Sequence, residues 1–456
     1  MLNNSHLSIP KLVFFVLALA LQIHFNLFAH AGYKGLLFNI ADLLLPFLGI
    51  YVAFSLLTQK SEWPIWQKPF GYWAPALMSL CIVFGVLNGY RLLGVWEPWS
   101  VFNKGIGWFV LMSYLMLGAW FAANYSSLIR QYFIQPFIIF LCVTCIIEMG
   151  LRLIVTHEIF PESVFFAEGR YPQVMGFMVN RNALAMLYCS SLALGSVFLT
   201  SNVELTRIEN YGFRLLWAIL PLFFVMNGSR TILLIAVPLI LFMLFKNWRL
   251  FLKQIAPLML PSFMFMPLLN IAQLNVLLEK YLGLLPKIAA NESARAAELS
   301  VSDSYRIKFI TDGLQLYRQN PITGAGIGAN KLYHLAEGER EQTVLDNSLI
   351  WVLTEMGPAA LIAFFSSYLA MFLSLKNKIK QTMITWHSTF YLSVIFMMMV
   401  FGIFSLFHEV LYSRFLWVFL GLGLGLPISQ QVISKHKANP ENVENNNLTP
   451  TPPQAV

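Results

Sequence analysis

The sequence predicts an all-α polytopic membrane protein with about twelve transmembrane helices and one large loop between the ninth and the tenth. Of its 456 residues, 57% are hydrophobic and only 11% are charged, whereas about 25% of residues are charged in a soluble globular protein. The apolar residues also form runs of roughly 17–25 residues, the length that crosses a bilayer core as a helix. This composition excludes an ordinary soluble enzyme.

The apolar runs define the predicted spans in chain order. Residues 227–230, Asn-Gly-Ser-Arg, are all that separates the seventh span from the eighth. Because an arginine at bilayer depth costs at least ~2.5 kcal/mol, we place Arg230 at the tip of a tight hairpin between two helices. The twelve predicted spans are 11–29, 35–57, 71–90, 105–123, 131–154, 182–200, 211–227, 229–246, 251–270, 346–375, 386–405 and 408–428.

The distribution of basic residues predicts the orientation. With the N-terminus inside, the cytoplasmic short loops hold twice as many Lys and Arg residues as the opposite short loops. We therefore predict a multi-pass membrane protein with both termini cytoplasmic. The net charge of +8 comes without a basic patch, so no nucleic-acid partner is expected. The predicted units are membrane helices in 1–174, a core in 175–375, membrane helices in 376–434 and a disordered tail in 435–456.

The long loop, about 271–345, is predicted to lie on the outer face and to contain one amphipathic helix over 304–319. Asn320-Pro321 ends this helix, because proline cannot continue it. A glycine loop follows, which allows the backbone to approach another group closely; its glycines are Gly324, Gly326 and Gly328. The predicted apolar stripe of the helix consists of Ile307, Ile310, Leu314 and Tyr317.

Three polar features fall on this predicted outer face. The first is Arg230 at the hairpin tip. The second is Arg306 on the loop helix, followed by the glycine loop. The third is Asp346-Asn347, where the next span begins. Two arginines bind a diphosphate through charge-assisted hydrogen bonds, and a carboxylate beside them accepts a proton from an attacking hydroxyl. We expect the three features to converge on one site.

These motifs resemble the O-antigen ligase and O-antigen polymerase family. The motifs are NGSRT (227–231), DSYRIKF followed by NPITGAGIG (303–328) and DNSLIWVLTEMGPAALI (346–362), with VNRNALAML (179–187) before them. The resemblance covers roughly 175–375. It implies an all-helical membrane glycosyltransferase that needs no metal or other cofactor. Such an enzyme takes a saccharide from an undecaprenyl-diphosphate carrier at the periplasmic face and transfers it to a glycan or lipid A-core acceptor.

On this interpretation, Arg230 and Arg306 bind the diphosphate and Asp346 is the base. Ligases of the family usually carry His-Asn where this chain has Asp346-Asn347, so the sequence favours a polymerase-type member. His334 lies twelve residues too early to replace that histidine. The candidates for contact with substrate are Asn347, Gly324, Gly326, Gly328, Arg170, Asn182 and His334.

Each candidate also has a plain structural interpretation. The two arginines would be interfacial anchors whose charged ends reach the lipid headgroups, Asp346 would be a helix N-cap, and the glycine loop would be a simple turn. We interpret His408-Glu409 as a structural pair rather than a catalytic one. At the level of the whole chain, the alternative is a transporter or flippase of a lipid-linked or anionic solute. A transporter places its key charges near the membrane midplane.

Overall fold

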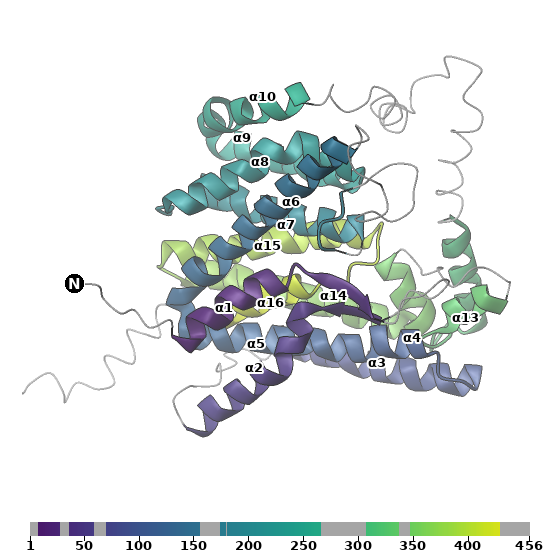
Figure 1. The fold of residues 1–456 in the computed structure, drawn as a ribbon. Coiled ribbons are helices and arrows are strands. Elements are labelled where there is room, and N and C mark those ends of the chain that lie inside the picture. The colour runs from purple at the N-terminus through teal and green to yellow at the C-terminus, as the bar shows by residue number, and fades with distance from the viewer. Residues whose placement is uncertain are drawn as a thin grey trace, which may run out of the picture.

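A computed structural model of the chain describes residues 8–27, 36–58, 70–155, 174–178, 180–265, 307–336 and 347–428. These residues form a bundle of helices, with α13 and α4 at one end of it (Figure 1). The first elements are α1 (Ile9–Ala20), β1 (His24–Leu27), β2 (Leu36–Asn39), α2 (Ile40–Leu57), α3 (Phe70–Leu93), α4 (Pro98–Ser100), η1 (Val101–Ile106), α5 (Gly107–Leu128), η2 (Ile129–Ile134) and α6 (Gln135–Val155). The later elements are α7 (Arg181–Thr200), α8 (Arg207–Asn227), α9 (Thr231–Leu250), η3 (Phe251–Ile255), α10 (Ala256–Phe265), α13 (Ala329–Ala336), α14 (Ser348–Gln381), α15 (Thr385–Ser405) and α16 (Arg414–Gly425).

Each of the twelve predicted apolar runs contains a helix. Among the described residues, eight helices are long and apolar enough to cross a membrane. One of them covers Pro98–Leu151, which is 54 residues and therefore ~80 Å of helix, more than twice the ~30 Å hydrocarbon core. It is kinked at Tyr125, whose backbone is not helical. The predicted hairpin at 227–230 is confirmed, since α8 ends at Asn227 and α9 begins at Thr231. The count of twelve crossings stays a prediction.

The structure is consistent with the predicted all-α membrane protein, but the first predicted span is not helical throughout. Helix α1 ends at Ala20, and β1 pairs antiparallel with β2, with His24 opposite Asn39 and Phe25 opposite Phe38. Apolar and polar residues alternate from Ile23 to Leu27, which is the period of a strand rather than of a helix. The predicted span 11–29 therefore joins a short helix to a strand.

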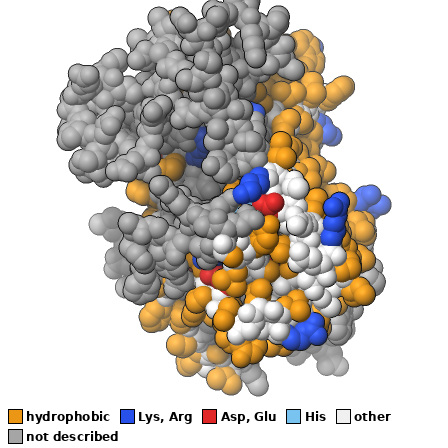
Figure 2. All heavy atoms as spheres, turned by 90° about the vertical axis from the view of Figure 1, so that its right-hand side faces the viewer, with side chains coloured by type: hydrophobic (Ala, Val, Ile, Leu, Met, Phe, Trp, Pro, Cys, Tyr) orange, Lys and Arg blue, Asp and Glu red, His pale blue; other side chains and the backbone are white. Residues whose placement is uncertain are grey.

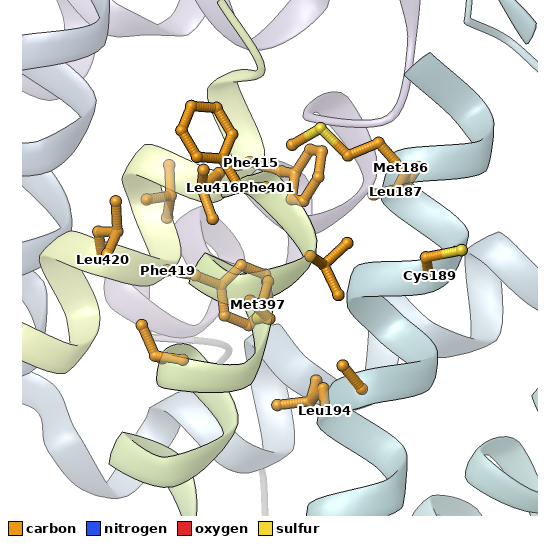
Figure 3. Packing of buried hydrophobic residues seen from close by; sticks show 14 of the residues in the cluster. Met186, Leu187, Cys189, Leu194, Met397, Phe401, Phe415, Leu416, Phe419 and Leu420 are labelled. Atoms are coloured by element: carbon orange, nitrogen blue, oxygen red, sulfur yellow. The ribbon is translucent and has the colours of Figure 1, made fainter. Parts of the chain in front are cut away.

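The centre of the bundle is α7, most of which is buried. Its residues Met186, Leu187 and Leu194 pack toward Met397 and Phe401 of α15 and toward side chains of α16 (Figure 3). The backbone of α16 in turn lies directly against the backbone of α5. A Cβ added to Gly421 would lie 2.2 Å from the carbonyl oxygen of Leu115. Close packing of small residues is the usual way in which membrane helices associate.

A buried ion pair joins two helix starts in this core. Arg414 at the start of α16 contacts Asp42 in the first turn of α2, with 2.9 Å between Nη2 and Oδ2. The Tyr114 hydroxyl donates a second hydrogen bond to this carboxylate over 2.8 Å. A buried charge is tolerated when it is paired and hydrogen-bonded, so this contact fixes the N-terminal elements against the C-terminal helix.

Candidate functional site

The NGSRT motif forms the turn between α8 and α9. Gly228 ends α8 in the left-handed conformation, with φ +69°. The Asn227 side chain donates to the carbonyl oxygen of Val174 over 2.8 Å and to that of Arg181 over 3.0 Å. These bonds tie the end of α8 to the start of α7. Arg230 is exposed at the tip, as predicted, while the neighbouring Ser229 is buried.

The turn meets the start of α14 through the segment 406–410. A hydrogen bond of 3.2 Å joins Thr231 Oγ1 to His408 Nε2. The Ser348 hydroxyl donates to the backbone oxygen of His408 over 3.1 Å, and the Asn347 amide donates to the backbone oxygen of Leu406 over 2.7 Å. Two of the three predicted features therefore converge here. We call this end of the bundle, which holds the first residues of α7, α9 and α14, the α14-start end.

Asn347 is the N-cap of α14. Its side-chain oxygen accepts hydrogen bonds from the backbone N–H groups of Leu349 and Ile350, each over 3.0 Å. The interpretation of Asp346 as this cap is therefore wrong, since the cap lies one residue later. Asp346 itself lies outside the described residues. Asn347 uses both ends of its amide within the protein, which argues for a supporting role rather than the predicted contact with substrate.

The glycine loop fills a break in α14. Gly357 has φ +81° and ψ 177°, and Pro358 follows it. Proline has no N–H, so the carbonyl of Thr354, four residues earlier, has no helical partner. The N–H of Ala325 donates to that carbonyl over 2.8 Å, and the N–H of Gly326 donates to the next carbonyl, that of Glu355, over 2.9 Å. The loop thus completes the backbone hydrogen bonding of α14.

The other side of the glycine loop lies against α3. The N–H of Ile327 donates to the carbonyl of Gly85 over 2.9 Å, and the Asn88 amide donates to the carbonyl of Gly324 over 3.1 Å. A Cβ on Gly326 would lie 2.2 Å from the Cα of Gly89. The loop does approach something closely, as predicted, and within the described residues that partner is protein backbone.

A buried carboxylate holds the end of the loop. Glu355 accepts hydrogen bonds from the backbone N–H groups of Gly328, over 3.2 Å, and Asn330, over 3.3 Å. The Trp351 indole donates a third over 2.7 Å. Only 3% of Glu355 is exposed. Three donors compensate for the removal of this carboxylate from water.

Two lysines complete a buried network of charges beside Glu355. Lys331 of α13 pairs with Glu97 over 2.9 Å, and Lys104 pairs with Glu409. The Lys104 ammonium lies 4.9 Å from the Tyr412 ring centroid, close enough for a cation–π contact. Figure 2 views the molecule from the side on which α13 lies in Figure 1. The described part of that surface carries few charged side chains among apolar ones.

The remaining predicted site residues fall into two groups. His334 is buried on α13, with its ring 4.7 Å from that of Phe309 and its Nδ1 4.0 Å from Asp312. Asn182 lies half-buried in the first turn of α7. Arg170 and Arg306, like Asp346, lie outside the described residues.

The predicted loop helix exists over 307–319, but its buried face differs from the predicted stripe. Ile307 is 66% exposed and Leu314 is also exposed. The contacts run instead through Phe309 and Asp312, which meet His334. Ile310 and Tyr317 are half-buried, so the predicted stripe and the buried face share only part of their residues.

Thr231 and Glu355 belong to the motifs at 227–231 and 346–362, but the sequence assigns neither of them a role of its own, and it indicates a structural role for His408. A signal existed for His408 and Glu409, since ionisable residues between apolar spans point to function or to a partner. In the described contacts His408 meets Thr231 and Glu409 meets Lys104, and both contacts are of a structural kind.

Comparison with known families agrees with this geometry. A family model described as O-antigen ligase matches residues 215–365. The match includes the α8–α9 turn, the glycine loop and the first turns of α14, but not His408. A search of curated proteins found no match. Residues 215–365 are therefore similar to the O-antigen ligase family, in agreement with the motifs quoted from the sequence.

Proposed function

We propose that the chain is a membrane glycosyltransferase that polymerises or ligates undecaprenyl-diphosphate-linked oligosaccharide at the periplasmic face of the inner membrane. The observation that carries this proposal is the contact of Thr231 and Ser348 with the same residue, His408. That contact brings the turn bearing Arg230 beside the helix start that follows Asp346. A cation for a diphosphate and a carboxylate for an acceptor hydroxyl thus belong to one site.

In the proposed reaction, the acceptor hydroxyl oxygen attacks the anomeric carbon as the bond from that carbon to the diphosphate oxygen breaks. The electron pair of this bond leaves with the diphosphate, and the hydroxyl proton passes to Asp346. Arg230 and Arg306 stabilise the charge that develops on the leaving diphosphate. Attack from the opposite side inverts the anomeric centre. Asn347, as the cap, orients the start of α14 and so the residue before it.

A polymerase is favoured over a lipopolysaccharide ligase, because Asp346 stands where ligases usually carry histidine. A glycan is then the favoured acceptor and the lipid A-core the second choice. Transport or flipping of a lipid-linked solute is the alternative from another class. The described candidate residues lie at the α14-start end, whereas a transporter is expected to place its charges near the midplane, so the enzyme is preferred.

The arginine roles can be tested by lysine substitution. A lipid anchor tolerates lysine, which keeps the charge, whereas bidentate binding of a diphosphate requires the guanidinium group. We expect Arg230→Lys and Arg306→Lys each to lose most glycan product at normal membrane abundance. Product is measured as polymer length and yield from a lipid-linked repeat unit in proteoliposomes. Full activity in both variants would contradict the proposed site.

A further inference from the structure

We propose that Glu355 is a positioning residue, which locks the segment 320–336 onto α14 and thereby supports the helix over 307–319, the helix that follows Arg306 in sequence. Its consequence for catalysis rests on the proposed function, but the docking itself does not. In the sequence, Glu355 lies within the motif DNSLIWVLTEMGPAALI (346–362), and the sequence assigns it no role of its own. The argument begins from the three hydrogen bonds to its carboxylate.

A carboxylate at this position is required by the donors around it. The two backbone N–H groups come from Gly328 and Asn330 and the indole N–H from Trp351, and an ionised carboxylate only accepts hydrogen bonds. Glutamine has one accepting oxygen and one donating NH₂ group. In Glu355→Gln at least one of these donors would face another donor. Because the site is buried, that donor would be left unsatisfied, which destabilises the docked segment.

The docked segment connects Glu355 to the helix that follows Arg306. Asn330 belongs to α13, and His334 on the same helix contacts Phe309 and Asp312 of the helix over 307–319. Arg306 is the residue directly before that helix. A hydrogen bond of 2.9 Å from the Gly324 N–H to the Asn320 carbonyl closes the turn between the helix and the loop. Release of α13 from Glu355 would therefore displace the start of the helix.

Lys331 provides a second attachment but of a different kind. Its ion pair with Glu97 joins α13 to the residues before α4, and not to α14. Within the described residues, the Glu355 side chain joins α13 to α14. The docking of α13 on α14, and with it the support of the helix over 307–319, therefore depends on Glu355.

The chain offers a matched control at the opposite end of the bundle. Glu209 of α8 is also 3% exposed, accepts a backbone N–H, that of Thr206, over 2.8 Å and pairs with Arg130 over 2.6 Å. Glu209→Gln is an equal chemical change in another buried carboxylate. It lies away from the docked segment, so it reports general damage to the bundle.

The experiment measures docking directly through a cysteine placed at Ala329, which is buried in the docked segment. In purified, detergent-solubilised full-length protein, mass spectrometry follows maleimide labelling of Ala329→Cys. We expect Glu355→Gln to raise the labelling rate about 10-fold or more and Glu209→Gln to leave it unchanged. An unchanged rate in Glu355→Gln, or an equal rise in Glu209→Gln, would overturn the docking role.

Glycan synthesis then tests the catalytic consequence. We expect Glu355→Gln to lose most product, and its combination with Arg306→Lys to lose little more than Arg306→Lys alone, because both changes remove one function. If the segment opens and Arg306→Lys is inactive, yet Glu355→Gln is fully active, the positioning role is wrong. If Arg306→Lys is itself fully active, the proposed function fails at Arg306 while the docking result stands.

Discussion

At the scale of single residues, Asn347 and Asp346 have separate tasks. The cap of α14 is the Asn347 side chain, which also binds the Leu406 carbonyl. Substitution of Asp346 therefore leaves the cap intact. We expect Asp346 to contribute to helix stability as a charge near a helix N-terminus, which is typically worth about 0.3–1 kcal/mol.

We expect Asp346→Asn to abolish most polymer synthesis at near-normal protein abundance. An amide cannot accept the acceptor proton, and loss of a general base typically lowers the rate ~10²–10⁴-fold. The measurement is the single-turnover rate with a lipid-linked repeat unit, together with the accumulation of unpolymerised repeats in cells. A wild-type rate would show that the carboxylate is not the base.

Asn347→Ala is the companion that separates structure from chemistry. It removes the cap, which costs roughly 1 kcal/mol, together with the bond to the 406–410 segment. It should lower thermal stability more than Asp346→Asn does, and retain more activity per folded molecule. If Asn347→Ala instead retained more stability and less activity than Asp346→Asn, the chemistry would belong to the Asn347 amide.

At the scale of elements, the glycine loop and the break in α14 require each other. Pro358 leaves the Thr354 carbonyl without a helical donor, and Ala325 supplies one. Gly326 has φ +88°, and an added Cβ would lie 2.2 Å from Gly89 Cα, a backbone contact that cannot be relieved by a rotamer change. The glycine loop is therefore held in place by α14 and α3, although in sequence it belongs to the long loop between the ninth and tenth predicted spans.

Gly326→Ala is accordingly expected to undock the loop. The left-handed conformation alone costs alanine roughly 1–2 kcal/mol, and the contact with α3 adds to it. Labelling of Ala329→Cys should rise as in Glu355→Gln. Gly49→Ala is the control, since nothing lies within 4 Å of its Cβ and alanine is the better helix former. Equal labelling of Gly326→Ala and the parent would contradict the close packing.

The sequence predicted well those elements in which a long apolar run ends at polar or helix-breaking residues. The hairpin at 227–230 follows from the cost of a membrane arginine, and the structure has it. The strand β1 was missed because five alternating residues were merged into a neighbouring apolar helix. The buried side of the helix over 307–319 was missed because its partner, His334, lies across a turn that periodicity does not describe.

At the scale of the whole molecule, the site depends on contacts that no local pattern encodes. Thr231 and His408 are 177 residues apart in sequence, and Glu97 and Lys331 are 234 apart. The sequence nevertheless predicted that the hairpin tip and the start of α14 meet, because both fall on one predicted face of the membrane. Alternation of spans thus predicts which end of the bundle a residue occupies, and packing then determines its neighbours.

The orientation of that end is the last prediction. The basic residues of the short loops predict that the α14-start end faces the periplasm. Gln315 on the loop helix and Asn377 near the other end of α14 are both exposed. In intact spheroplasts, we expect a membrane-impermeant maleimide to label Gln315→Cys but not Asn377→Cys, and to label both after lysis.

The native cysteines give the background of this measurement. Cys142, Cys145 and Cys189 are buried and Cys81 is partly buried, all within apolar helices, so the unsubstituted protein should label weakly on either side. If Asn377→Cys were labelled in intact spheroplasts and Gln315→Cys were not, the site would face the cytoplasm. A periplasmic transfer from the lipid carrier would then be impossible, even if every contact between α9, α14 and the glycine loop were correct.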